Sequence, residues 1–290
     1  MAFLRGLVWL GLCAAAVTVL AALWSGLHPA LDSFGVWLVY GTGMALALAV
    51  LCLLLRHWAG AAMGGLLLLV GTVQLAPHAR AFGATEGDAL RVLQHNLKYL
   101  NAAPDLADRL QGVEIATLQE VKAAQASLDA LPEGWTVILC PGTRVGGQAV
   151  ATVLPVTETG CARGVAWARV ETPEGPFSVV SLHLNWPWPF NQAQQLEEIL
   201  PDLSEVPRPI LVAGDFNQTP WSAAVARVAE ATGTTPLPDL RPTFALDGGV
   251  LRVNIDHILV PDGWGGQVAL AQTEGSDHAA LRAQLGPVAP

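Results

Sequence analysis

A carboxylate and an amide stand two residues apart in the sequence Gly-Asp-Phe-Asn, at Asp215 and Asn217. The motif directly follows an apolar run of strand length, residues 209–213. Side chains at this spacing point the same way from an extended chain, and α/β folds usually place their chemistry at the carboxyl ends of buried strands. The same residue types also form Asx turns that only close a strand. The motif alone therefore leaves both interpretations open.

Thr219 and Pro220 come next and predict the start of a helix. Threonine is a good N-cap, and proline is tolerated at the first helical position because its missing N–H would have no partner there. A helical spacing of apolar residues over 221–229 continues the pattern.

Further polar groups recur where other apolar runs stop. Each has a simple structural explanation when taken alone, as a turn residue, a helix N-cap or a half-buried ring. So many ionisable side chains at strand ends indicate one shared site. They are Asn96, Glu120, His183, Asp256, Asp277 and His278.

The types of these side chains suit the hydrolysis of a phosphoester. Oxygen ligands such as Glu120, Asp277 and the amide of Asn96 suit a hard cation, which predicts Mg²⁺, with Mn²⁺ as the alternative. The sequence has no His/Cys cluster of the kind that binds zinc. The reaction also needs a base for the attacking water and a donor for the leaving oxygen. Two histidines and an aspartate can supply these.

The elements that must position these groups alternate between strands and helices. This pattern over about 200 residues predicts an α+β fold, with two packed sheets and helices outside, rather than one parallel sheet. The predicted strands cover 90–95, 113–119, 135–140, 148–154, 164–170, 177–184, 209–213, 253–260 and 279–285, and the predicted helices cover 105–110, 191–200 and 221–229.

The N-terminal part of the chain has a different composition. Mean hydropathy over the whole chain is +0.43, and the first 85 residues hold only four charged side chains, Arg5, Asp32, Arg56 and Arg80. Three apolar runs, 7–24, 34–55 and 58–75, are each near the ~20 residues that cross a bilayer. A signal peptide is the alternative for the first run, but two further runs favour a retained anchor.

We therefore expect a membrane anchor over residues 1–76 with three transmembrane helices, a linker over 77–88 and one domain over 89–290. Arg5 and Arg56 lie on one side of the spans, whereas the loop 25–33 has no Lys or Arg. The positive-inside rule then places the N-terminus inside and the domain outside the inner membrane. Cys140 and Cys161 are the only cysteines of the domain. They permit a disulfide outside the cytosol, and in the cytosol two free thiols are expected.

The order of motifs resembles the metal-dependent endonuclease/exonuclease/phosphatase superfamily with the DNase I-like fold. The resemblance covers about residues 90–285 and is most similar to uncharacterised membrane-anchored bacterial members. It rests on the Asn-bearing strand, Leu-Gln-Glu, Ser-Leu-His-Leu, Gly-Asp-Phe-Asn, Ile-Asp-His-Ile and Ser-Asp-His, which contain Asn96, Glu120, His183, Asp215 with Asn217, Asp256, and Asp277 with His278.

The resemblance implies a four-layer α/β sandwich and a role for each residue. Glu120 and Asp277 would bind the metal ion, with Asn96 near it. Asp256 would orient His278, Asp215 would position or deprotonate the water, and Asn217 and His183 would stabilise the phosphorane-like transition state. Whether Asp215 or His278 is the base stays open.

Two features depart from or extend the family pattern. Many members carry a polar or basic residue just before the proline of the central strand, where this chain has Leu154 before Pro155, so a substrate contact is missing or moved to Arg144. The aromatic segment Trp186–Phe190 follows His183 directly. It can stack on a base or sugar, rest on the outer leaflet or form an ordinary hydrophobic corner.

The function predicted from the sequence is an Mg²⁺-dependent phosphoesterase that cleaves a small or lipid-borne phosphodiester at the outer face of the inner membrane. A membrane-tethered endonuclease or exonuclease and a non-catalytic binding module are the alternatives. After Arg80 the chain carries 12 of its 15 basic and 23 of its 24 acidic residues, a net charge of −11. This charge argues against long duplex DNA, although a short strand remains compatible. The bilayer is the partner of the N-terminal helices, and protein partners are not predicted.

Overall fold

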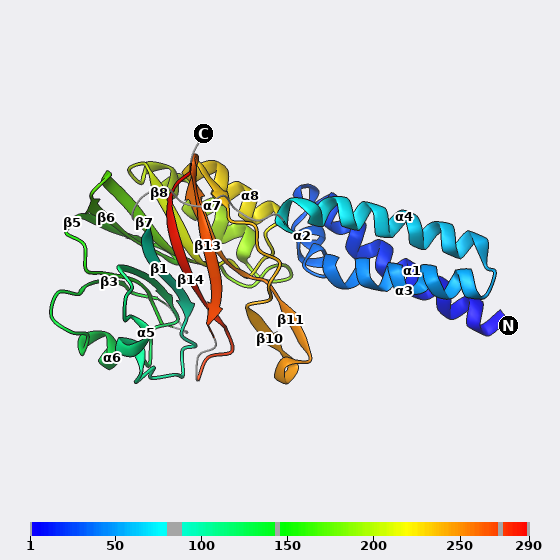
Figure 1. Cartoon of the computed structure of the whole chain (residues 1–290), viewed down its shortest axis with the longest axis horizontal. Helices are drawn as coiled ribbons and strands as arrows, with labels where there is room; N and C mark the ends of the chain where they lie inside the picture. Colours follow the sequence, from blue (N-terminus) through cyan, green and yellow to red (C-terminus); the bar gives the residue numbers. More distant parts are fainter. Residues whose placement is uncertain (1, 80–88, 143–145, 272–274, 289–290) are drawn as a thin grey trace.

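The computed structural model describes residues 2–79, 89–142, 146–271 and 275–288. Arg80, most of the predicted linker (80–88) and Arg144, the proposed substitute for a family substrate contact, lie outside these residues. Figure 1 shows the two parts of the chain, a bundle of helices at the N-terminal end and a sandwich of sheets that contains β1 to β14 and α5 to α8.

The sandwich consists of two six-stranded sheets packed face to face. The first sheet has the order β13 (Trp264–Ala271), β14 (Ala280–Pro287), β1 (Leu90–Asn96), β2 (Ile115–Gln119), β4 (Gln148–Thr152) and β3 (Thr136–Cys140). The second has the order β5 (Val156–Ala162), β6 (Val165–Thr172), β7 (Gly175–His183), β8 (Ile210–Asp215), β12 (Asp256–Pro261) and β9 (Thr234–Pro236). A hairpin of β10 (Phe244–Leu246) and β11 (Leu251–Val253) stands apart.

The apolar strands predicted from the sequence form the core of this sandwich. Val92, Val179 and Leu211 come from both sheets and pack in one buried cluster between them. Every residue of β8 is buried, because its other face lies under the helices α7 (Gln192–Glu205) and α8 (Ala223–Thr232). The helices α5 (Leu106–Arg109) and α6 (Gln125–Asp129) pack against the first sheet. The predicted four-layer α/β sandwich is confirmed.

A disulfide joins Cys140 and Cys161, which is one of the two alternatives that the sequence left open. These cysteines lie in β3 and β5, each an edge strand of its own sheet. The bond therefore joins the two sheets at one side of the sandwich.

The predicted start of the helix after Gly-Asp-Phe-Asn was wrong. α8 begins at Ala223, and Ser222 is its N-cap, with Oγ accepting a hydrogen bond from Val225 N at 3.1 Å. Thr219 and Pro220 lie in the preceding loop. Ser222 is also a good capping residue, and the next two amides bind a carboxylate from far away in the sequence.

The N-terminal bundle contains α1 (Ala2–Leu23), α2 (Pro29–Gly35), α3 (Leu38–Leu54) and α4 (Trp58–Leu75). Short 3₁₀ turns, Ser25–Leu27 and Ala76–Ala79, follow α1 and α4. Two helices, Phe3–Leu23 and Trp58–Ala79, are long and apolar enough to cross a membrane, and α2 with α3 makes a third span if this pair, bent by 59°, counts as one. The predicted second span, 34–55, is therefore broken near its start. The helices pack closely at glycine, since a Cβ at Gly71 would lie 2.1 Å from Thr42 Oγ1.

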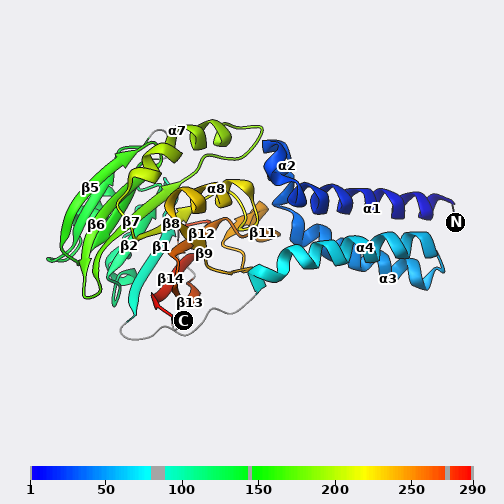
Figure 2. The same ribbon diagram turned by 90° about the horizontal axis from the view of Figure 1, so that it is seen from above.

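The bundle docks on the sandwich through α2, which lies at their junction (Figure 2). The Asp32 carboxylate accepts hydrogen bonds from the amides of Ala223 and Ala224 at 2.9 and 3.1 Å. These amides belong to the first turn of α8, whose N–H groups have no partner within the helix. A residue of the N-terminal bundle therefore completes the cap of a helix in the sandwich.

Two more contacts hold the junction. Trp221 Nε1 donates to the Gly35 carbonyl at 2.8 Å. The Tyr40 hydroxyl donates to the carbonyl of Arg252 in β11 at 2.8 Å and accepts from the backbone amide of the same residue at 2.9 Å. The N-terminal bundle therefore contacts both α8 and the β10–β11 hairpin. This docking was not predicted from the sequence.

Candidate active site

Three of the predicted residues lie in one row across the second sheet. β7 runs parallel to β8 with His183 opposite Asp215, and β12 runs antiparallel to β8 with Asp256 opposite Asp215. His183 and Asp215 are the last residues of their strands and Asp256 is the first of its strand. The strand ends therefore meet at one edge of the sheet, as the sequence indicated.

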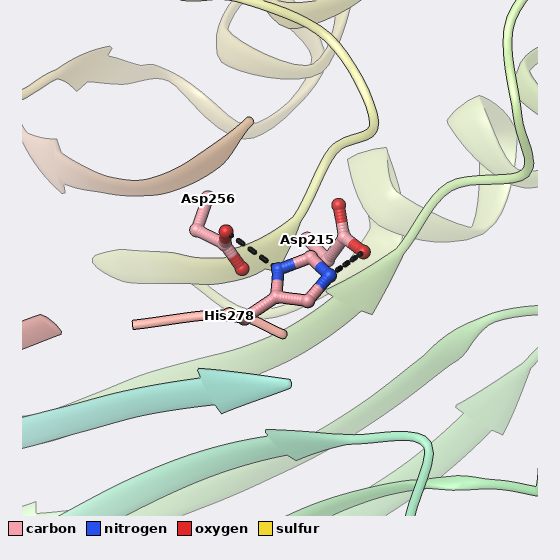
Figure 3. Close-up of side chains that lie close together, drawn as sticks. All are labelled: Asp215, Asp256 and His278. Atoms are coloured by element: carbon pink, nitrogen blue, oxygen red, sulfur yellow. Dashed lines mark hydrogen bonds and ion pairs between the residues drawn. The ribbon is translucent and has the colours of Figure 1, made fainter. Parts of the chain in front are cut away.

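Asp256 and His278 form a buried pair (Figure 3). His278 Nδ1 lies 2.8 Å from Asp256 Oδ2, and the other oxygen, Oδ1, accepts a hydrogen bond from Gln94 Nε2 at 3.1 Å. Burial opposes the charged imidazole, but the carboxylates of Asp256 and Asp215 outweigh it and raise the pKa of His278 to about 9. His278 is therefore an imidazolium at neutral pH, with both ring nitrogens as donors.

The partner carboxylate shows the reciprocal effect. Burial alone would raise the pKa of Asp256, but the charge and hydrogen bond of His278 outweigh burial and hold it below its usual value. Thr243 Oγ1 accepts a hydrogen bond from the Asp256 amide at 3.1 Å and so fixes the start of the strand. The predicted orientation of His278 by Asp256 agrees with this geometry.

Asp215 lies at the centre of the cluster. Its Oδ2 accepts a hydrogen bond from Asn96 Nδ2 at 3.0 Å and lies 3.6 Å from His183 Nε2 and 3.8 Å from His278 Nε2. Its Oδ1 accepts a hydrogen bond from the backbone N–H of Asn217 at 2.8 Å. Burial raises the pKa of Asp215 to about 6, against the opposing effect of the nearby histidines. Asp215 is therefore mostly ionised at neutral pH, with a pKa suited to a general base.

Asn96 and Glu120 connect the first sheet to this cluster. Asn96 Nδ2 also lies 3.3 Å from Glu120 Oε1, and Glu120 Oε2 accepts from the Tyr99 amide at 2.9 Å. Glu120 Oε1 is 3.8 Å from His183 Nε2. Glu120 has φ 55°, in the left-handed region that costs energy for a residue with a Cβ. Such strain is common at functional sites, and here it occurs at the predicted metal ligand.

Asp277 lies at the edge of the cluster. Its side chain is 37% exposed, and its carboxylate forms an ion pair with Lys98 Nζ at 3.5 Å. The neighbouring backbone is held in place, because Ser276 Oγ donates to the Asn96 carbonyl at 2.7 Å and accepts from the His278 amide at 3.1 Å. The loop that carries Asp277 is thus tied to the end of β1.

Within the described residues, one group of three Asp, Glu, His or Cys side chains has its ligand atoms within 4.8 Å of one another, Asp215, Asp256 and His278. This is not the predicted metal set of Asn96, Glu120 and Asp277. Its atoms already bind one another, so a cation there would displace the bond between His278 and Asp256. The carboxylates of Glu120 and Asp277 are 17% and 37% exposed and leave room for the water ligands that Mg²⁺ retains. The donor chemistry of the predicted set fits Mg²⁺, and the set itself stays a prediction.

His183 and Asn217 each have a further hydrogen-bond partner. Burial lowers the pKa of His183, so its ring is neutral at neutral pH. Gln148 Nε2 lies 3.5 Å from His183 Nδ1. Asn217 Nδ2 donates to the Leu184 carbonyl at 2.8 Å, and its backbone has φ 49°. Both side chains lie near the Asp215 carboxylate, with His183 Nε2 at 3.6 Å and Asn217 Nδ2 at 3.5 Å from Oδ2, and their predicted role in the transition state stays a prediction.

Several site residues were not predicted. Gln94 binds Asp256 and also donates to Gln119 Oε1 at 2.9 Å, and Gln119 Nε2 donates to Ser181 Oγ at 3.0 Å. The signal was the spacing of Gln94 and Asn96, which share one face of β1. The Phe244 ring, 4.6 Å from the His278 ring, gave no signal because β10 is short.

The aromatic segment after His183 is not a buried corner. Trp186, Trp188 and Phe190 are 51%, 46% and 66% exposed. The Trp186 ring lies 6.0 Å from Phe244, and the Trp188 ring lies 6.4 Å from Phe34 of α2. The segment therefore extends from the active site to the N-terminal bundle.

Comparison with known proteins agrees with this geometry. The model of the Endonuclease/Exonuclease/phosphatase family matches residues 87–278, a span that contains every predicted site residue. The chain belongs to this family. Family members act on phosphoester bonds, and the chain is a hydrolase of that class. No curated protein matches the chain.

Solved structures show the same fold. The 3′ phosphatase NExo from Neisseria, in a variant form bound to a product DNA hairpin, is 16% identical, with 68% of this chain and 99% of that chain covered and a TM-score of 0.55. An endonuclease/exonuclease/phosphatase from Bacteroides vulgatus is 17% identical, with coverages of 69% and 100% and a TM-score of 0.54. A beta toxin from Staphylococcus aureus with bound magnesium ions is 12% identical, with coverages of 68% and 99% and a TM-score of 0.52.

Proposed function

We propose that this protein is an Mg²⁺-dependent phosphodiesterase whose N-terminal helices (residues 1–76) hold a catalytic domain (89–290) at the outer face of the inner membrane. The substrate is a small or lipid-borne phosphodiester. The observation that carries the proposal is the buried relay from Asp256 through His278 to Asp215, within reach of Asn96 and Glu120.

Asn96, Glu120 and Asp277 hold the metal ion in this proposal. Their donor atoms are oxygens, which suits Mg²⁺, with Mn²⁺ as the alternative. The bound magnesium in the staphylococcal beta toxin, which shares the fold, supports the choice. The cation neutralises charge on the phosphate oxygens.

Asp215 is the general base of the reaction. A water oxygen attacks phosphorus, its proton goes to the ionised Asp215 carboxylate, and the bond from phosphorus to the leaving alcohol oxygen breaks. The proton that the leaving oxygen takes up comes from solvent. His278 cannot accept the water's proton at neutral pH, because its pKa of about 9 keeps it protonated. Its imidazolium, with Asn217 and His183, stabilises negative charge on the phosphoryl oxygens.

The charge of the sandwich favours a small or lipid-borne diester over duplex DNA. The net charge of −11 after Arg80 opposes the phosphates of a long duplex. The nuclease alternative is supported by the shared fold of the Neisseria 3′ phosphatase, which was solved with a DNA hairpin. A binding module would have no need of the buried relay from Asp256 to Asp215.

The orientation in the membrane is supported by two features. Arg5, Leu55 and His57 line one cavity, which places Arg5 and the α3–α4 turn that holds Arg56 at the same end of the bundle. These basic residues favour the cytoplasmic side. The disulfide between Cys140 and Cys161 suits an oxidising compartment on the other side. A C-terminal alkaline phosphatase fusion is expected to be active and a green fluorescent protein fusion dark, and the reverse pattern would overturn the orientation.

The substrate class is tested by incubating the full chain in detergent with Mg²⁺ and either plasmid DNA or diesters of phospholipid head groups. The expected result is turnover of the diesters. Asp215→Asn protein is the control for a contaminating hydrolase. Nicking of the plasmid at physiological salt without diester turnover would establish the nuclease alternative instead.

A further inference from the structure

An apolar cavity lies between the N-terminal bundle and the sandwich. It has a volume of about 280 Å³. One wall comes from the bend between α2 and α3, and the other comes from the aromatic segment after His183 and from the β10–β11 hairpin. The lining includes Phe34, Val36 and Trp37 of the bundle and Trp186, Trp188 and Phe244 on the other side.

The cavity adjoins the reacting groups. Asn217 lines it and has Nδ2 3.5 Å from Asp215 Oδ2. Phe244 lines it too, and its ring lies 4.6 Å from the His278 ring. A molecule with its phosphoryl group at Asp215 and His278 would therefore carry its next atoms directly into the cavity.

The lining of the cavity selects an apolar occupant. Among the described residues that line it there is no charged side chain, and besides the indole N–H groups of three tryptophans only Ser33 and Asn217 have polar side-chain groups. Burying a sugar or a second phosphate against such walls costs several kcal/mol unless each polar group finds a partner. A hydrocarbon chain needs no partner and gains free energy from leaving water.

The position of the cavity fits a chain that enters from a bilayer. It lies where the apolar helix α3 begins, at the bend of 59° that follows α2. Phe34 and Trp188 are 44% and 46% exposed on its rim, and aromatic side chains favour the membrane surface. One water-sized group occupies about 30 Å³ in a liquid, so the cavity holds a chain of roughly nine groups of methylene size.

We propose that this cavity binds a hydrocarbon chain of the substrate, so that the substrate is a lipid phosphodiester and the membrane anchor forms part of its binding site. The inference rests on the proposed phosphodiesterase activity and adds a specificity determinant to it. Trp37 and Val36 of the anchor then contact the substrate, which a simple tether would not do.

The test uses the full chain in detergent micelles with Mg²⁺ and three p-nitrophenyl alkyl phosphodiesters, the methyl, butyl and octyl compounds. These share one leaving group and one charge and differ only in the alkyl chain. We expect kcat/KM to rise roughly two- to fourfold for each methylene that the cavity buries.

Three variants separate the cavity from other effects. Trp37→Ala removes a wall and Val36→Trp fills the space, and each is expected to lower the octyl-to-methyl ratio of kcat/KM at least tenfold. Trp24→Ala is the matched control, because Trp24 is an exposed tryptophan of the same bundle that does not line the cavity. It is expected to keep the wild-type ratio. The Tm of each variant shows that it folds.

The outcomes distinguish the inference from the proposed function. Turnover of all three diesters without a chain-length dependence would overturn the cavity inference and leave the phosphodiesterase proposal standing. The same chain-length dependence in wild type, Trp37→Ala and Val36→Trp would show that the chain partitions into the micelle, which also overturns it. Absence of turnover for every diester, with Mg²⁺ or Mn²⁺, would overturn the proposed function and this inference together.

Discussion

His278 Nδ1 lies 2.8 Å from Asp256 Oδ2, and both side chains are buried. The second oxygen of Asp256, Oδ1, accepts a hydrogen bond from the side-chain Nε2 of Gln94 at 3.1 Å. The ring of His278 is thereby fixed with Nε2 toward Asp215 (Figure 3). The hydrogen bond to Asp256 fixes the orientation of the His278 ring and favours its charged form. The expected effects of substitutions on turnover and of pH on stability follow from this interaction.

Removing either member of the pair is expected to reduce turnover at saturating metal. His278→Ala removes a positive charge next to the reacting phosphoryl group, and a loss of about 10²-fold or more in kcat is expected. Asp256→Asn keeps the shape but no longer fixes the imidazolium, and a smaller loss is expected. His28→Ala, which changes an exposed histidine of the N-terminal bundle, is the control. Unchanged kcat in His278→Ala would remove this residue from the mechanism.

The stability of the metal-free protein is expected to depend on pH through His278. Its pKa is raised from 6.5 to about 9 in the fold. When the pKa of a group is higher in the folded than in the unfolded state, its protonation stabilises the fold. This contribution is complete at pH values below the unfolded-state pKa and is lost as the pH rises through the folded-state pKa. The difference in Tm between wild type and His278→Gln, measured in EDTA, should therefore be largest near pH 6 and shrink by about pH 9.5. A difference that grows with pH would show that the buried ring is neutral.

The predicted metal ligands Glu120 and Asp277 are expected to determine the affinity for Mg²⁺. Glu120→Gln and Asp277→Asn each remove one negative charge from the predicted ligands, so the Mg²⁺ concentration for half-maximal activity should rise, by roughly tenfold or more each. The control variants are Glu158→Gln and Asp129→Asn, which change exposed carboxylates away from the site. Titration of activity with Mg²⁺ measures the effect. Unaltered metal dependence in both site variants would exclude Glu120 and Asp277 as ligands.

The docking of the anchor is expected to depend on Asp32. Its carboxylate binds the amides of Ala223 and Ala224, and the loss of a helix cap costs about 0.5–2 kcal/mol. In Asp32→Ala the hydrogen exchange of these two amides should become faster, and Asp32→Asn, which keeps one acceptor oxygen, should give a smaller effect. Asp202→Ala, at an exposed position of α7, serves as the control. Equal exchange rates in all variants would mean that the bundle does not hold α8 in solution.

Local patterns were sufficient to predict the sandwich and its catalytic edge. Asp215 and Asn217 follow an apolar strand, and β8 is buried along its whole length, so the end of that strand had to lie at a rim. His183 and Asp256 were assigned to the same site because polar residues interrupt or end the apolar runs, although Asp256 lies inside the predicted strand 253–260 and is the first residue of β12. Their exact register came only with the pairing of β7, β8 and β12.

Other features depend on contacts that local sequence does not contain. The helix start at Ala223 is fixed by Ser222 and by Asp32, which is 191 residues away in the chain. β5 and β13 were not predicted, because β5 is largely exposed and β13 contains Gly265 and Gly266, which have low strand propensity. The N-terminal helices were predicted only to tether the domain. Hydropathy shows that a helix is apolar, but it does not show which part of the protein the helix packs against.

The proposed role of Asp215, as the group that takes the proton of the attacking water in an Mg²⁺-dependent phosphodiesterase, can be tested by a single experiment. The most direct measurement is the steady-state hydrolysis of bis-p-nitrophenyl phosphate by the full chain in detergent, with and without Mg²⁺, for wild type and Asp215→Asn. We predict Mg²⁺-dependent turnover in wild type and a loss of about 10²-fold or more in kcat for Asp215→Asn at saturating Mg²⁺. Turnover that is independent of the metal would contradict the Mg²⁺ dependence, and equal turnover in the two proteins would contradict the role of Asp215 as general base.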